Sequence, residues 1–134
     1  MIACYMKKVL LFIIILLSLQ TNAQLLVSTP DFITESVTST TIIADASKGN
    51  QKLLGNTADI YVHIGAITNL SPTGADWKYV SSVWGTADAK FKCVALGNNK
   101  WSYTIPTNLR SYFGITNANE KILKIAILFR DAAG

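Results

Sequence analysis

Alternation of apolar residues with period two most constrains the fold, because it predicts strands that are buried on one face. The alternation is clearest in residues 91–105 (FKCVALGNNKWSYTI), where a turn-forming cluster at 97–100 separates two alternating arms. This stretch predicts a β-hairpin. Its second arm places Trp101 and Tyr103 on one face, which serves either to fill a core or to stack on a flat ligand. Their alternation with Ile105 favours the core.

Similar patterns predict further strands along the chain. These strands cover residues 24–28 (an edge strand closed by Pro30), 36–44, 59–68 (core face Ile60, Val62, Ile64 and Ala66), 77–84 and 122–130. The last of them is almost continuously apolar, which is typical of a strand in the middle of a sheet. A short helix is predicted over 106–114, with Thr107 as its N-cap and Gly114 as its end. The elements together predict an all-β, immunoglobulin-like sandwich with one short helix.

The two ends of the chain suggest how it is organised. We expect residues 1–23 to be a signal peptide, 24–36 an N-terminal edge or linker, and 37–134 the β-sandwich module. The chain stops in a turn directly after the predicted central strand 122–130. We therefore expect the sandwich to be truncated at its C-terminus, with its last strands missing and an apolar strand edge exposed. Residues 45–57 are predicted to be a polar loop that Leu53 and Leu54 attach to the core.

The N-terminus has the features of a secretory signal. Lys7 and Lys8 precede an apolar run over 9–19, and small residues end at Ala23, which predicts cleavage between Ala23 and Gln24. The run is too short to span a bilayer, so a membrane anchor is the weaker interpretation. No cysteine follows the signal to carry a lipid. The product is expected to be secreted, and translation starts at either Met1 or Met6.

The charge of the processed chain argues against some partners. Removal of residues 1–23 leaves 111 residues and lowers the basic residues from 12 to 10 against 8 acids, a net charge of +2. Without a run of Lys or Arg, neither nucleic acid nor a membrane surface is an expected partner. Cys93 is then the single cysteine, expected to be a small buried hydrophobe.

The sequence offers little for catalysis. The mature acids all lie in predicted loops or at strand ends, namely Asp31, Glu35, Asp45, Asp59, Asp76, Asp88, Glu120 and Asp131. Glycoside hydrolysis needs two carboxylates across a cleft, and no predicted element closes one. There is no Gly-x-Ser-x-Gly motif, and His63 is the only histidine. We therefore expect no catalytic residue, metal site or cofactor in this chain, and we expect His63 to be a hydrogen-bonded strand residue.

Sugar binding is the sharper hypothesis, because a pyranose packs its C–H face on an exposed aromatic ring and its hydroxyls on polar side chains. The candidate contacts are Trp84, Tyr61, Tyr79, Lys78, Asn98, Asn99 and Lys100. The alternative is that these aromatics fill the core or face a missing domain. Within this set, Trp84 and the turn at 98–100 are the preferred contacts.

The stretch 42–69 (IIADASKGNQKLLGNTADIYVHIGAITN) resembles the N-terminal module of secreted α-amylase-family glycoside hydrolases from Bacteroidetes. The matching positions are Asp45, Ala46, Gly49, Asn50, Tyr61, His63 and Gly65, followed in order by 76–80, 84–85, 96–97, Trp101, 109–114 and 129–130. In that family the module is an immunoglobulin-like or carbohydrate-binding-like domain that precedes a catalytic barrel. The resemblance covers almost all of the mature chain.

The resemblance implies a non-catalytic accessory module that braces a downstream catalytic domain of the same polypeptide. It also implies a polysaccharide context, with starch-like α-glucan as the first candidate. Two alternatives remain open at this point: a stand-alone secreted carbohydrate-binding protein, and a structural or adhesion domain of the immunoglobulin-like type.

Overall fold

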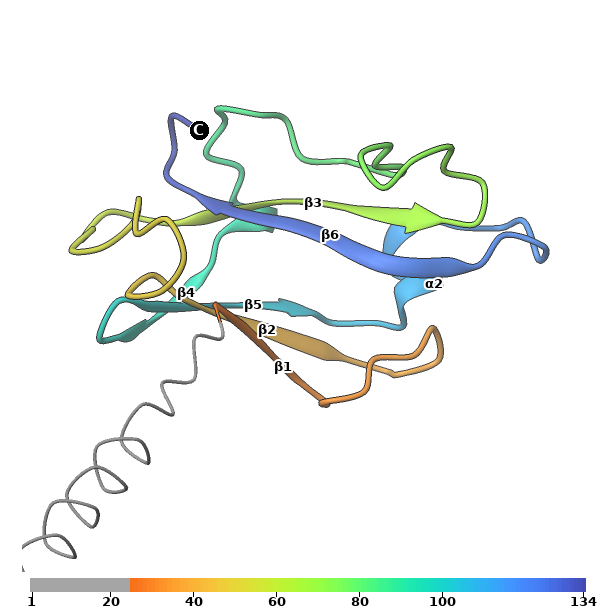
Figure 1. Ribbon diagram of the computed structural model, residues 1–134, viewed down its shortest axis with the longest axis horizontal. Coiled ribbons are helices and arrows are strands. Elements are labelled where there is room, and N and C mark those ends of the chain that lie inside the picture. The colour runs from red at the N-terminus through yellow and green to blue at the C-terminus, as the bar shows by residue number, and fades with distance from the viewer. Residues whose placement is uncertain (1–24) are drawn as a thin grey trace, which may run out of the picture.

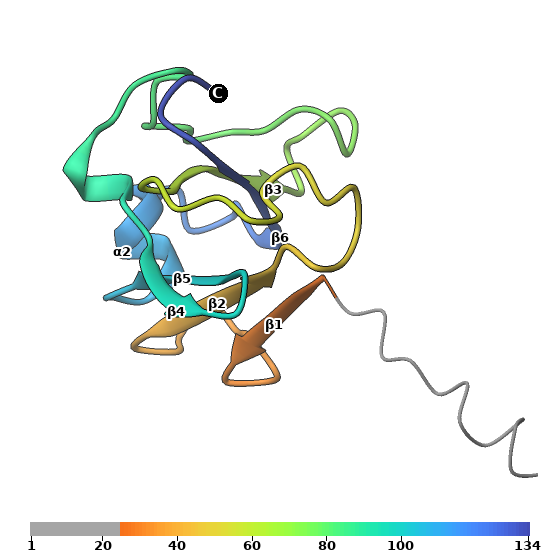
Figure 2. The same ribbon diagram turned by 90° about the vertical axis from the view of Figure 1, so that its left-hand side faces the viewer.

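The computed structural model describes residues 25–134, which form two antiparallel β-sheets packed face to face (Figures 1 and 2). The elements are β1 (Leu26–Thr29), β2 (Thr40–Asp45), β3 (Tyr61–Thr68), the 3-10 turn η1 (Ala89–Phe91), β4 (Val94–Gly97), β5 (Lys100–Ile105), helix α2 (Leu109–Phe113) and β6 (Ile122–Arg130). One sheet has the order β1-β2-β5-β4, and the other pairs β3 with β6. The predicted all-β sandwich with one short helix is confirmed. The predicted signal peptide and its cleavage point, Ala23–Gln24, lie outside the described residues.

The core lies between the inner faces of β3 and β5. The predicted core residues of the third strand, Ile60, Val62, Ile64 and Ala66, are all buried. They pack in one cluster with Trp101 and Tyr103 of β5. Burying each large apolar side chain in this way stabilises the fold by about 1.5–3 kcal/mol. The core interpretation of Trp101 and Tyr103 is therefore confirmed.

The predicted hairpin forms between β4 and β5. Its loop is Asn98-Asn99, and both residues have positive φ, 49° and 60°. Two consecutive left-handed residues make a type I′ turn, whose twist matches that of the flanking strands, and asparagine tolerates this conformation well. The first arm is shorter than predicted. Phe91 ends η1, because Asp88 Oδ1 accepts the N–H of Lys90 and starts that turn instead.

The prediction of a strand over 77–84 is wrong. This segment makes a single bridge, Lys78 to Ala66, and its backbone leaves extended geometry at Tyr79, where φ is +58°. The N–H of Ile64 also points away from β6. It donates to the side-chain oxygen of Ser82 instead of to a backbone carbonyl. Residues 77–84 lie across the outer face of β3, above that strand in Figure 1, and are called here the cover over β3.

The predicted strand over 122–130 is confirmed, but its predicted place in the middle of a sheet is wrong. Among residues 25–134, β6 pairs only with β3, so it lies at a sheet edge rather than in the middle. A bulge places Ile122 opposite Thr68 and Lys124 opposite Ile67, which leaves Leu123 without a partner. Leu123 is consequently 61% exposed, not aligned with the inward residues, and Ile122 packs against the core instead.

The remaining elements agree with the sequence except in detail. β1 is an edge strand as predicted, and β2 begins only at Thr40. Helix α2 ends at Gly114 as predicted, with φ +68°. Its N-cap is Asn108 and not Thr107, because Asn108 Oδ1 accepts the Ser111 N–H that the start of the helix leaves free. Leu53 packs against the core, whereas Leu54 is exposed.

Gly65 gives a testable consequence of the cover over β3. A Cβ at this position would lie 2.6 Å from Val80 Cγ2 and 2.9 Å from the Lys78 carbonyl oxygen. We expect Gly65→Ala to lower the free energy of unfolding by about 1–3 kcal/mol, measured by urea denaturation. Gly74→Ala is the matched control, since nothing lies within 4 Å of its Cβ position. Equal stability of the two variants would contradict this packing.

Candidate functional site

An exposed tryptophan beside a pocket that apolar and polar residues line together is the candidate site. Trp84 is 52% exposed and lines a pocket of about 610 Å³ at one end of the sandwich. The pocket, called here the Trp84 pocket, is lined by apolar and polar residues. The apolar ones come from the core strands and their ends and from the β2–β3 loop, namely Leu25, Leu26, Ala44, Ala46, Leu53, Trp101, Ile127, Leu128 and Phe129. The polar ones come from the β2–β3 loop (Lys48, Asn50, Gln51 and Lys52) and from the end of β6 with the turn after it (Arg130 and Asp131).

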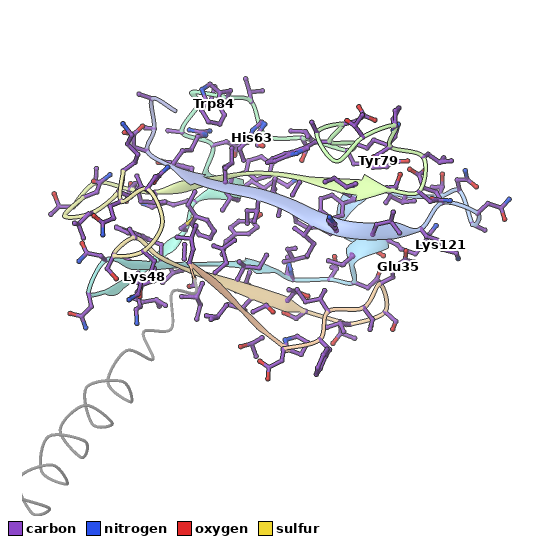
Figure 3. All side chains as sticks on the ribbon, viewed as in Figure 1. Glu35, Lys48, His63, Tyr79, Trp84 and Lys121 are labelled. Atoms are coloured by element: carbon purple, nitrogen blue, oxygen red, sulfur yellow. The ribbon has the colours of Figure 1, made fainter. Side chains whose placement is uncertain are left out.

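The indole of Trp84 is held from behind by β3 and β6. The His63 ring is nearly perpendicular to the indole, with 5.3 Å between the two ring centroids. The guanidinium carbon of Arg130 lies 5.6 Å from the centroid of the indole. Figure 3 shows Trp84 and His63 together on the outer side of β3. Gly134 packs so closely against the indole that a Cβ there would overlap it. Because these contacts fix the ring, its exposed part is a preformed flat surface.

Arg130 organises this end of the molecule although it has no carboxylate partner among the described residues. It is 4% exposed, and its Nη atoms donate to the carbonyls of Val83, Thr86 and Asp131. These bonds fasten the segment that carries Trp84 to the end of β6. Tyr61 lies beneath the same guanidinium, 5.9 Å from its ring centroid.

His63 is a structural residue. Its Nδ1 shares a hydrogen bond of 2.9 Å with Ser82 Oγ, and its ring stacks on Trp77 at 5.9 Å. Burial, and to a smaller extent the charge of Arg130, lowers the pKa of His63. The imidazole is therefore neutral at pH 7 and serves to position Trp77 and Trp84. The hydrogen bond is as predicted, although its partner belongs to the cover over β3.

The aromatic and basic candidates on the β3 side are not gathered at one place. Tyr61 is buried, at 6% exposure, so it offers no surface to a ligand. Lys78 and Tyr79 lie near the opposite end of β3 from Trp84, as Figure 3 shows for Tyr79. The Tyr79 hydroxyl donates to Glu120 Oε2 at 2.6 Å, and Lys78 is 3.9 Å from Asp76.

The hairpin tip forms a separate, smaller pocket. Asn98, Asn99 and Lys100 line a space of about 320 Å³ together with Asn56, Asp59 and Lys92. Asn99 Oδ1 accepts the Gly55 N–H at 2.7 Å, and Lys100 lies 3.7 Å from Asp45. Of the sequence-based candidates, therefore, only Trp84 borders the larger pocket. The sequence-based set did not include the residues of the β2–β3 loop that line this pocket. The run of polar residues between Gly49 and Leu53 is the only sequence feature that could have indicated them.

The carboxylates of the described chain are engaged locally. Seven of the eight acids accept a hydrogen bond or face a lysine or arginine, namely Glu35, Asp45, Asp59, Asp76, Asp88, Glu120 and Asp131. The Ile122 N–H lowers the pKa of Glu35, and hydrogen bonds from Ser47 lower that of Asp45. Hydrogen bonds from Tyr79 and Thr68 lower the pKa of Glu120. Such acids stay ionised at neutral pH.

Residues 25–134 also offer neither a metal site nor a reactive thiol. No group of three His, Cys, Asp or Glu side chains there is placed to hold a metal ion. Burial raises the pKa of the Cys93 thiol to about 12, so it stays protonated and unreactive. No helix in this part of the chain has the length and apolar character to cross a membrane.

Comparison with known proteins adds no assignment. No protein-family model matches the chain, and no curated protein matches it. The site must therefore be interpreted from its own chemistry.

Glu120 gives a pH-dependent test. Because its pKa is lowered on folding, its contribution to stability is present above about pH 4.3 and is lost as the pH falls through the lower value in the folded state. Glu120→Gln should be less stable than the natural chain at pH 7 and should lose less stability on acidification. Urea midpoints at pH 7, 5 and 3.5 measure this. Parallel pH profiles for both proteins would contradict it.

Proposed function

We propose that this chain is a non-catalytic N-terminal accessory module of a secreted glycoside hydrolase that acts on starch-like α-glucan. It braces the downstream catalytic domain and contacts glycan at the Trp84 pocket. The observation that carries the proposal is the Trp84 ring, half-exposed and held rigidly by His63 and Arg130 beside a polar loop. The resemblance of residues 42–69 to such modules supplies the enzyme class and the glycan.

The chemistry of the Trp84 pocket suits a sugar ring. The indole offers a flat apolar surface for the C–H face of a pyranose. Hydroxyl groups of the sugar need donors and acceptors at the rim, which Asn50, Gln51 and Lys52 of the β2–β3 loop supply. Part of this capacity is used within the loop, since Gln51 Nε2 donates to the Ser47 carbonyl at 2.9 Å. Asn50 Oδ1 similarly accepts the Lys52 N–H, so the loop is already shaped without ligand.

A non-catalytic role is supported by the state of the acids. A glycosidase needs one carboxyl group with a raised pKa, to protonate the leaving oxygen, opposite a second carboxylate. The pKa values of Glu35, Asp45 and Glu120 are instead lowered by their hydrogen bonds. In this proposal the hydrolysis belongs to the downstream domain.

The same surface supports a bracing role. Val83, Trp84 and Leu128 are exposed apolar residues at or next to the Trp84 pocket. An exposed apolar group beside fixed polar residues is typical of a surface that meets another domain. A stand-alone secreted carbohydrate-binding protein would use the same indole in the same way. The reading frame beyond Gly134 separates the two functions, and we expect it to encode a barrel with paired carboxylates. A stop codon with no such domain would contradict the accessory role.

Glycan contact is tested by affinity electrophoresis in gels that contain amylose. We expect the natural chain to be retarded and Trp84→Ala to bind about tenfold more weakly, because it removes the stacking surface. Phe32→Ala is the matched control, since Phe32 is an aromatic residue that is 89% exposed and does not line the Trp84 pocket. Glycan contact is refuted if the natural chain is not retarded, or if both variants migrate alike.

A further inference from the structure

The cover over β3 is held at each end through a backbone carbonyl. At one end, the Lys78 carbonyl accepts the N–H of Ala66 in β3 at 2.8 Å. At the other end, the Val83 carbonyl accepts a hydrogen bond of 3.1 Å from Arg130 Nη2. Among the described residues, one polar link joins the stretch between these two points to β3. That link is the side chain of Ser82.

The link through Ser82 has a direction, because each of its partners has a limited role. Ser82 Oγ accepts the Ile64 N–H at 3.3 Å, since a backbone N–H can only donate. The Ser82 hydroxyl proton is then available for His63 Nδ1, which lies 2.9 Å away. This direction pairs every polar group of the link. Nδ1 therefore accepts with its lone pair, and the neutral imidazole carries its proton on Nε2.

Protonation of His63 is incompatible with this link. A second proton on the ring occupies Nδ1 and removes the one acceptor that the Ser82 hydroxyl has within residues 25–134. Ser82 Oγ would then face two N–H donors while its own proton had no partner. Because Ser82 is only 6% exposed, water does not readily replace that partner, and an unpaired buried hydroxyl is costly. The link holds only while His63 is neutral.

The charged group nearest to His63 also opposes its protonation. The groups around the imidazole are Trp77, Ser82 and Trp84 of the cover, Arg130 of β6, and Tyr61 on the same face of β3. No carboxylate of the described chain pairs with His63. A charged imidazole is attracted by an indole, but the Arg130 guanidinium already faces the Trp84 ring, and the two cations repel each other. Burial and the charge of Arg130 accordingly lower the pKa of His63.

We propose that the Ser82–His63 hydrogen bond is a proton-sensitive latch. When His63 takes up a proton from solvent at Nδ1, the middle of the cover over β3 is released between its two fixed ends. The Ile64 N–H then loses its partner, and the indole of Trp84 shifts relative to the imidazole. Mild acid thus moves an exposed aromatic ring while the two sheets stay folded. The latch goes beyond the proposed glycan contact and is tested without glycan.

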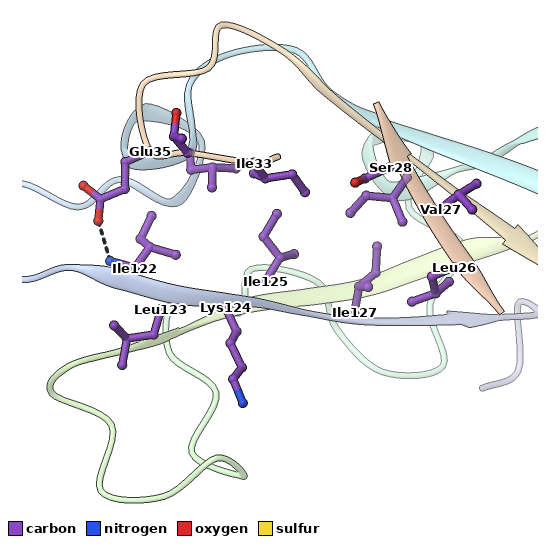
Figure 4. Close-up of a pocket in the computed structure, with 13 residues that line it drawn as sticks. Leu26, Val27, Ser28, Ile33, Glu35, Ile122, Leu123, Lys124, Ile125 and Ile127 are labelled. Atoms are coloured by element: carbon purple, nitrogen blue, oxygen red, sulfur yellow. Dashed lines mark hydrogen bonds between the residues drawn. The ribbon is translucent and has the colours of Figure 1, made fainter. Parts of the chain in front are cut away.

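The pH range separates the latch from the acid-sensitive bonds of two carboxylates. Glu35 accepts the Ile122 N–H, which Figure 4 marks with a dashed line, and Glu120 accepts two hydroxyl protons. The pKa of both groups is lowered, so they stay ionised above about pH 4.3. The folded state favours neutral His63. Its link is therefore complete above the unfolded pKa of about 6.5 and is lost as the pH falls through the lower pKa of the folded state.

The test is an NMR titration of the untagged, ¹⁵N-labelled protein between about pH 7.5 and about pH 5. His63 is the single histidine of the sequence, so its ring signals identify themselves. We expect the proton on Nε2 at the upper pH. As His63 becomes charged, the indole N–H signals of Trp77 and Trp84 should shift, and the protection factor of the Ile64 amide should fall at least about tenfold. The Gly65 amide, which bonds β6, should keep its protection.

Three variants separate the latch from simple packing. His63→Asn keeps an acceptor oxygen near the position of Nδ1 but takes up no proton, so the protection of Ile64 should no longer change with pH. Ser82→Ala removes the link, so the Ile64 amide should be weakly protected at both ends of the titration. Thr86→Ala is the matched control. It also removes a hydroxyl, just after the cover, but one that donates to the Val83 carbonyl, and it should respond to pH like the natural chain.

Four results would overturn the proposal. One is a ring proton on Nδ1 at the upper pH, because Ser82 would then not donate to it. Another is a His63 that stays neutral throughout the titration, or that titrates at or above its ordinary pKa. A third is an Ile64 amide that keeps its protection while His63 becomes charged. The fourth is the same pH response in His63→Asn. None of these results involves glycan, so the latch and the glycan contact fail independently.

Discussion

The structure depends on β3, which is covered on both faces and bonded along both edges. Its inner side chains form the centre of the core with β5, and its outer face lies under Trp77, Val80 and Ser82. One edge pairs with β6. On the other edge, Ala66 exchanges backbone hydrogen bonds with Lys78, and the carbonyl of Ile60, just before the strand, accepts the N–H of Cys93. Both Trp84 and β6 are held in place by this strand. Trp84 rests on His63, and β6 has β3 as its single strand partner within residues 25–134.

Much of this arrangement follows from the sequence because burial and periodicity coincide in β3 and β5. Ile60, Val62 and Ile64 alternate and are all inside, and Asn98-Asn99 forms the turn that its residue types favour. The segment 77–84 misleads because its side chains, Trp77, Val80 and Ser82, cover a neighbouring strand instead of forming a strand of their own. Leu123 misleads because a bulge turns it outward and brings Ile122 inward in its place, and a binary pattern carries no sign of a bulge.

The candidate site was harder to predict than the fold. Trp84 is exposed as the sequence suggested, but its pocket is completed by the β2–β3 loop and by the turn after β6, which are distant in the chain. Loop placement depends on contacts such as Asn99 Oδ1 with the Gly55 N–H, which no local pattern encodes. Three residues of the family resemblance, Gly65, His63 and Tyr61, have packing roles. Gly65 leaves room for the segment that covers β3, His63 packs against Trp84, and Tyr61 packs against Arg130. A structural motif of this kind supports kinship in fold more directly than it supports a shared ligand.

Within residues 25–134, β6 is bonded along one edge only, the edge that faces β3. Amide hydrogen exchange of the protein alone, followed residue by residue by NMR, tests this most directly. We expect an alternating pattern along the strand, with slow exchange at Ala126, Leu128 and Arg130, whose N–H groups bond β3, and fast exchange at Ile125, Ile127 and Phe129. Uniformly slow exchange over residues 124–130 would contradict it, because the outer edge would then already be paired.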